Sequence, residues 1–231
     1  MNLHSFRLLI ALALAATLSA CNESVLDFPV PTPAKVRIVN TSRDADTLGV
    51  VIDSTIKLAV ARGAVSAAAD VSAGRPITFI VTYQGVQIGR DTARYTLGAN
   101  GSMVLFARGS KQKLLSFNSP VQDTTLAADE PNAFVKFTNA CEYDFVEAGG
   151  LVELFTGTGD RVFKEQYPPD ITSPHWSRVA PGTYTFVLRE AGTTRELARI
   201  DNVTLAAGKS YMIFCYDRNP PALDDIGLSI F

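Results

Sequence analysis

Gly, Pro, Asn and Asp residues divide the chain into short segments, and these segments carry the pattern of β-strands. Three of them alternate polar and apolar residues: 35–40, 78–83 and 183–188. Alternation is typical of a strand with one buried face, whereas the continuous apolar runs 102–107 and 211–216 are typical of strands buried on both faces. Gly63 and its β-branched neighbours argue against a helix in the alanine-rich residues 59–69. The sequence therefore predicts an all-β protein, most simply a β-sandwich.

Short phrases from the first half of the chain return in the second half in the same order. The matched pairs are 35–40 with 134–139, 71–74 with 179–182, 78–81 with 185–188, and 96–102 with 204–210. Because chance does not supply four matches in order, we expect two tandem copies of one β-domain. The predicted domains are residues 34–118 and 133–231, the second with a C-terminal tail, joined by a polar linker over residues 119–132.

The N-terminus has the layout of a secretory signal that ends in a cysteine. Arg7 supplies a positive charge, residues 8–18 are almost wholly apolar, and Leu18-Ser19-Ala20-Cys21 resembles the lipobox at which bacterial lipoproteins are cut and lipidated. We expect residues 1–20 to be removed and Cys21 to carry acyl chains that anchor the protein to a membrane. The alternatives are an ordinary signal with a chance cysteine and a retained membrane helix, for which the run is short.

The residues after Cys21 bear on location. In bacterial lipoproteins an Asp directly after the lipidated Cys is a signal for retention in the inner membrane, and Asn22 stands there instead. The resemblance therefore implies the outer membrane of a bacterial cell envelope, on either its periplasmic or its surface face. Residues 28–33 read Phe-Pro-Val-Pro-Thr-Pro, a composition that favours extended polyproline II. We therefore expect residues 21–33 to form a lipidated, Pro-rich tether.

Charge and ligand chemistry exclude some partners. The formal net charge is −2 and no Lys/Arg cluster occurs, so nucleic acid is not an expected partner. His175 is the one histidine after the signal, and there is no Cys-x-x-Cys motif, so neither a metal site nor a cofactor is predicted. Asp44-Ala45-Asp46 with Asp53 would offer oxygen ligands to Ca²⁺, although turn capping is the simpler interpretation.

Signals of catalysis are sparse, and we predict that the protein is not an enzyme. There is no Gly-x-Ser-x-Gly motif, and His175 lies in a Pro-flanked segment without a clear nucleophile partner. A pair of carboxylates that hydrolyses glycosides is not excluded by the sequence. The candidates are Asp144, Glu147, Glu153 and Asp160, but acidic residues on loops or alternating strands by default face solvent.

Once Cys21 carries lipid, Cys141 and Cys215 remain as a pair. In an oxidising periplasm two such cysteines most often form a disulfide, which we predict here. The bridge would close a loop of about 75 residues, stabilising the fold by on the order of 4 kcal/mol in the chain-entropy model. Two buried thiols and a metal-binding pair are the alternatives.

Three residues of the long insert over 163–178 are candidates for ligand binding: Tyr167, His175 and Trp176. Aromatic side chains on a loop above a rigid sandwich can stack on a sugar or hold a peptide. The alternative for Trp176 is that its indole packs into its own core.

Several phrases resemble a bacterial family known as domain of unknown function 4397. In the first copy they are Val-Asn-Thr-Ser-Arg-Asp-Ala at 39–45 and Val-Ile-Asp at 51–53. In the second they are Ala-Pro-Gly-Thr-Tyr at 180–184 and Ala-Gly-Lys-Ser-Tyr at 207–211, whereas Cys-Glu-Tyr-Asp at 141–144 replaces the Ser-x-Asp-Ala phrase. The resemblance implies immunoglobulin-like sandwiches on the cell envelope and assigns no activity.

Three functions are consistent with these observations. The first is a non-catalytic, lipid-anchored envelope protein whose sandwiches serve adhesion, scaffolding or ligand binding, with an envelope protein or a glycan as partner. The second is an accessory subunit of an envelope assembly or transport complex. The third is an enzyme that acts on glycan or peptide.

Overall fold

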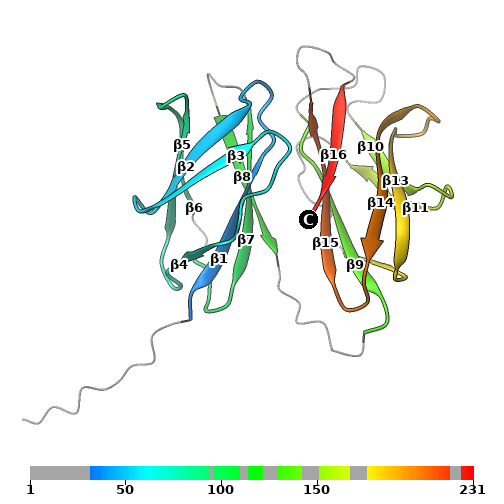
Figure 1. The fold of residues 1–231 in the computed structure, drawn as a ribbon, viewed down its shortest axis with the longest axis horizontal. Helices are drawn as coiled ribbons and strands as arrows, with labels where there is room; N and C mark the ends of the chain where they lie inside the picture. Colours follow the sequence, from blue (N-terminus) through cyan, green and yellow to red (C-terminus); the bar gives the residue numbers. More distant parts are fainter. Residues whose placement is uncertain are drawn as a thin grey trace, which may run out of the picture. The chain divides into compact units, whose positions relative to one another are not determined.

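The alternating segments form β-strands that build four four-stranded sheets (Figure 1). The computed structural model describes residues 32–93, 96–109, 114–121, 130–141, 151–166, 176–218 and 225–231. Residues 32–231 belong to one compact unit. The predicted all-β class and the tandem β-sandwiches are confirmed, with no helix in the described ranges. Accordingly, these ranges contain no helix long and apolar enough to cross a membrane.

The first sandwich consists of eight strands in two sheets. One sheet has the order β4 (Ala69–Val71), β1 (Ala34–Asn40), β7 (Ser102–Gly109), β8 (Leu114–Val121). The other has the order β3 (Ile56–Ala61), β2 (Thr47–Ile52), β5 (Ile77–Tyr83), β6 (Val86–Ala93). Strands β1 and β7 are parallel, and the remaining pairs are antiparallel. Alternate residues such as Ile38, Phe79 and Leu105 fill the core between the sheets.

The second sandwich repeats this topology strand by strand. One sheet has the order β12 (Ser177–Val179), β9 (Ala133–Asn139), β15 (Ser210–Asp217), β16 (Ile226–Ile230). The other has the order β11 (Arg161–Gln166), β10 (Val152–Thr156), β13 (Gly182–Glu190), β14 (Glu196–Leu205). The register is repeated as well, because Lys35 pairs with Ser102 in the first copy and Phe134 with Ser210 in the second. Each strand therefore has its equivalent eight strands later.

Strands β7 and β15 are buried on both faces, as their continuous apolar sequences predict. In β7, Leu105 enters the core of its own sandwich, whereas Phe106 points the other way and packs against the second sandwich. Six buried residues meet there, and we call them the inter-sandwich cluster: Val39, Val104, Phe106, Ala140, Met212 and Phe214. The rings of Phe106 and Phe214 meet edge to face, with centroids 5.8 Å apart. One apolar face thus joins the two domains.

Strand β8 extends beyond the predicted start of the linker. Val121 pairs with Ser102 and Pro120 with Met103, so residues 119–121 belong to the sheet. Pro120 is tolerated because β8 is an edge strand, where one side needs no backbone donor. Residues 122–129 of the predicted linker lie outside the described ranges.

Candidate functional site

The structure describes half of the residues that the sequence predicts for a site. Three lie outside the described ranges: Cys21, Tyr167 and His175. Their roles in lipidation and ligand binding stay predictions. The other three are described: Trp176, Cys141 and Cys215. The structure separates these, because Trp176 borders a cleft while both cysteines lie in the core of the second sandwich.

Trp176 precedes β12, is half-buried, and lines a cleft with a volume of about 210 Å³. Both sandwiches contribute to the walls of this Trp176 cleft: Arg37, Ser102, Val104, Trp176, Ser210, Tyr211, Met212 and Phe231. The indole is not part of the second core, so the structure does not support the alternative in which Trp176 packs inside its own domain.

Strand alternation decides which side chains face the cleft. In β7, Met103 enters the first core, so its neighbour Val104 faces the second sandwich. In β15, Ile213 enters the second core, so Met212 faces the first sandwich. Val104 and Met212 belong both to the inter-sandwich cluster and to the lining of the cleft. The cleft is therefore continuous with the packed interface between the sandwiches.

Two cations occupy equivalent positions on the faces that meet. Arg37 on β1 is in register with Val104, and Lys136 on β9 is in register with Met212. Arg37 lines the cleft, while the Lys136 Nζ atom lies over the Trp176 ring, 5.6 Å from its centroid. Lys136 is only 7% exposed, and this burial lowers the pKa of its ammonium group. Within the described ranges, neither cation forms an ion pair with a carboxylate.

Aromatic rings on this side of the second sandwich are held in place by polar neighbours. The Arg178 guanidinium lies over the Phe134 ring, 5.7 Å from its centroid, two residues along the chain from Trp176 and Lys136 respectively. The Tyr211 hydroxyl accepts a hydrogen bond of 3.0 Å from the backbone N–H of Ala206. These contacts restrict the rings near the cleft before any ligand arrives.

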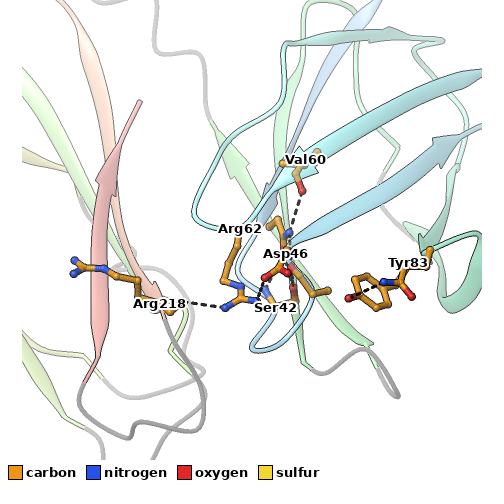
Figure 2. Close-up of polar contacts among 9 residues, drawn as sticks. Ser42, Asp46, Val60, Arg62, Tyr83 and Arg218 are labelled. Atoms are coloured by element: carbon orange, nitrogen blue, oxygen red, sulfur yellow. Dashed lines mark hydrogen bonds and ion pairs between the residues drawn. The ribbon is translucent and has the colours of Figure 1, made fainter.

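Arg62 forms a polar contact between the two sandwiches. Figure 2 shows its guanidinium between Asp46 of its own domain, with which it pairs, and the backbone carbonyl of Arg218, to which it donates a hydrogen bond of 2.9 Å. Gly63, the next residue, lies so close to the Tyr216 ring that a Cβ would collide with it. Both contacts join residues of the first sandwich to residues of the second.

Cys141 and Cys215 lie side by side in the second core. Their Sγ atoms are 3.0 Å apart, both residues are fully buried, and both are free thiols here. Burial raises the pKa of the Cys141 thiol well above its usual value, and the hydrogen bond to Cys215 raises it further. The proximity that a disulfide requires is therefore present, and the covalent bond stays a prediction. No cluster of three or more potential metal ligands occurs in the described ranges.

The internal repeat shows what replaces the thiols in the first copy. When β1 is aligned with β9, Ser42 takes the position of Cys141. When β7 is aligned with β15, Ala107 takes the position of Cys215. The Asn40 side-chain oxygen accepts the Ser42 N–H at 3.0 Å, as that of Asn139 accepts the Cys141 N–H at 3.3 Å. The two copies therefore share one turn with different buried side chains.

The aspartates considered for Ca²⁺ have other partners in the structure. Asp53 accepts a hydrogen bond of 2.9 Å from the Thr78 N–H and pairs with Arg75 at 2.9 Å, while Asp46 pairs with Arg62. The partners of Asp53 lie in another segment of the chain rather than in its own turn, so turn capping by Asp53 stays a prediction.

Sequence reasoning found Trp176 but missed the cations and hydroxyls around it. Arg37 and Lys136 each lie between two apolar residues at matched positions of the repeat, and this signal could have identified them as a pair. Ser102 and Ser210 are also matched in the repeat, but the sequence does not show that they share a cleft, because this depends on the packing of one sandwich on the other.

No family model matches the sequence, and no curated protein matches it. Among solved structures, the chain is similar to the carbohydrate-binding module CBMbc (family CBM26) from Eubacterium rectale Amy13K, crystallised in complex with maltoheptaose. The two share 8% sequence identity with a TM-score of 0.27, and the match covers 85% of this chain and 96% of that chain. A likeness of this size carries no argument about the ligand.

Proposed function

We propose that the protein is a non-catalytic binding protein of the bacterial cell envelope, tethered through lipid on Cys21, and that its paired sandwiches hold a ligand in the Trp176 cleft. The cleft itself carries the proposal. Binding sites are concave, with aromatic and apolar walls and a few polar groups that fix orientation, and the Trp176 cleft has this composition.

The chemistry of the cleft supports binding rather than catalysis. Its eight described lining residues include no carboxylate side chain, imidazole or thiol, which are the usual groups in acid–base and nucleophilic catalysis. Its volume of about 210 Å³ lies below the range of about 300–1,000 Å³ that is common for drug-sized ligands, so it suits a single ring or side chain of a larger ligand.

An accessory subunit that docks through an apolar surface has less support. In the described ranges, Val86 is the one large hydrophobic residue that is exposed, with 66% of its surface accessible to solvent. A single exposed residue does not make an apolar docking surface.

The test is an array of glycans and peptides probed with the full-length lipoprotein in detergent. We expect a ligand that binds the unmodified protein and binds Trp176→Ala at least about tenfold more weakly, since stacked aromatic anchors dominate binding energies. Trp176→Phe should recover part of the affinity, because it keeps a ring at this position.

Phe155→Ala is the matched control. Phe155 also has a cation over its ring, with Arg189 4.6 Å from the centroid, but it belongs to β10 in the other sheet of the second sandwich. Melting temperatures would show that each variant is folded. Equal binding by Trp176→Ala and the unmodified protein, or no binding on the array at all, would contradict the proposal.

A further inference from the structure

The environment of Lys136 points to the charge of the ligand. Its side chain is 7% exposed, lies on the sheet face that meets the other sandwich, and has the Trp176 ring as its cation partner. An ammonium group with no carboxylate partner is costly to bury, and the ring offsets only part of that cost. A buried cation of this kind is stabilised when an anion binds beside it.

Arg37 is a second cation without a carboxylate partner in the described ranges, and it belongs to the first sandwich. It is equivalent to Lys136 in the tandem repeat and lines the cleft. Arginine presents a planar fork of donors that fits a carboxylate in a bidentate manner. Arg37 thus lines the cleft itself, whereas Lys136 is not a lining residue and acts from beside the Trp176 ring.

We propose that the ligand of the Trp176 cleft is an acidic glycan, held with a sugar ring against Trp176 and its carboxylate against Arg37, with the nearby charge of Lys136 adding to the attraction. This inference rests on the proposed function and specifies its ligand class.

The cleft geometry favours a sugar over a peptide. Peptides that bind sheets usually add a strand to an exposed edge and form main-chain hydrogen bonds. The Trp176 cleft lies instead on sheet faces, where β1, β7 and β15 each have a hydrogen-bonded neighbour on both sides. An indole face packs on the C–H face of a pyranose ring, and the hydroxyls of Ser102 and Ser210 can exchange hydrogen bonds with sugar hydroxyls.

The test compares acidic glycans with neutral partners of the same shape by calorimetry. The probes are trigalacturonate and its methyl ester, a hyaluronan tetrasaccharide and its methyl ester, and sialyllactose and lactose, with triglutamate and acetate as further probes. We expect at least one acidic member to bind the full-length protein about tenfold or more tightly than its neutral partner, since hydrogen bonds between charged groups are the stronger kind.

Charge removal tests the residue assignment. Arg37→Gln should remove most of the preference for the acidic member and Lys136→Gln a smaller part of it, while both leave the neutral member's affinity within about twofold. Lys57→Gln is the control, because it removes one exposed cation from β3, in the other sheet of the first sandwich. Both cleft variants should keep the fold, and melting temperatures would verify this.

The outcomes separate the two proposals. Equal binding of an acid and its ester, weakened by Trp176→Ala, would overturn the acidic-glycan inference and leave the proposed function standing. Binding of triglutamate or acetate with the affinity of the best acidic glycan would also overturn it. An acid preference that survives both Arg37→Gln and Lys136→Gln would refute the residue assignment. Absence of glycan and peptide binding on the array contradicts the proposed function itself.

Discussion

Lys136 is the residue whose environment is least expected for its type. Lysine is almost never fully buried without a partner, yet this one sits between two domains with a ring over its Nζ atom. The repeat made Lys136 recognisable as the equivalent of Arg37. Its burial could not be predicted, because it depends on the second sandwich meeting the first.

Replacing Lys136 by methionine should stabilise the protein without ligand. Lys136→Met removes a desolvated charge and keeps a long apolar side chain, so we expect a gain of about 1–3 kcal/mol in the free energy of unfolding near pH 7. Urea unfolding measures this gain, with Lys57→Met, at an exposed position, expected to change stability by less than about 0.5 kcal/mol.

The same variant has a pH signature. Burial lowers the Lys136 pKa from 10.5, so the unfolded chain binds this proton more strongly than the folded one. The cost of the buried charge is therefore fully present below the folded pKa and disappears as the pH rises toward 10.5. The advantage of Lys136→Met should shrink between neutral and alkaline pH, and an advantage that grows with pH would refute this assignment.

The Cys141 and Cys215 pair should form a disulfide when the protein is exported to an oxidising compartment. Peptide mapping by mass spectrometry without reductant should recover the two cysteines as one cross-linked species. Reduction should lower the free energy of unfolding by on the order of 4 kcal/mol, because the bridge closes a loop of about 75 residues. Free thiols on both residues of the exported protein would show that the pair stays reduced.

The tandem repeat supplies a control for this pair. The double variant Cys141→Ser, Cys215→Ala installs the side chains of the first copy, Ser42 and Ala107, so it should fold. Its stability should not change on addition of reductant.

At the scale of elements, strand type and burial were largely predictable. The alternating segments 35–40 and 78–83 became β1 and β5, and the continuous runs in β7 and β15 are buried on both faces. What the sequence could not show is which surface covers the second face. A continuous apolar strand is equally suited to the interior of a large sandwich, and only the fold reveals the other domain there.

Gly63 should be more sensitive to substitution than its backbone conformation explains. Gly63 has φ of 69° and faces the Tyr216 ring, whereas Gly85 has φ of 80° and open space, with nothing within 4 Å of the point that a Cβ would occupy. Gly85→Ala should therefore cost about 1 kcal/mol from backbone strain, and Gly63→Ala should cost about 1–3 kcal/mol more because it also displaces the ring. Urea unfolding compares them, and equal costs would mean that the ring contact between the sandwiches is not tight.

At the scale of the molecule, a repeated domain has produced a cleft that neither copy holds alone. The Trp176 cleft takes Arg37 from the first sandwich and Trp176 from the second. The tandem repeat was evident in the sequence, but the cleft was not, since each of its walls looks like an ordinary outer face of a sheet.

Membrane attachment should depend on Cys21. Cys21→Ser removes the thiol that the lipid would occupy, so the variant should move from the membrane fraction to the soluble fraction of fractionated cells. A conservative change nearby, Ser24→Ala, should leave the protein in the membrane fraction. Persistence of Cys21→Ser in the membrane fraction would disprove anchoring through this residue.

The most direct measurement of the central claim is the fluorescence of Trp176 during titration with the ligand that binds best on the array. Trp176 is the single tryptophan of the chain, so its emission reports on this cleft alone. We expect the emission to change with the same saturation curve that calorimetry gives. Saturable binding that leaves the emission of Trp176 unchanged would show that the ligand lies elsewhere, contradicting the account.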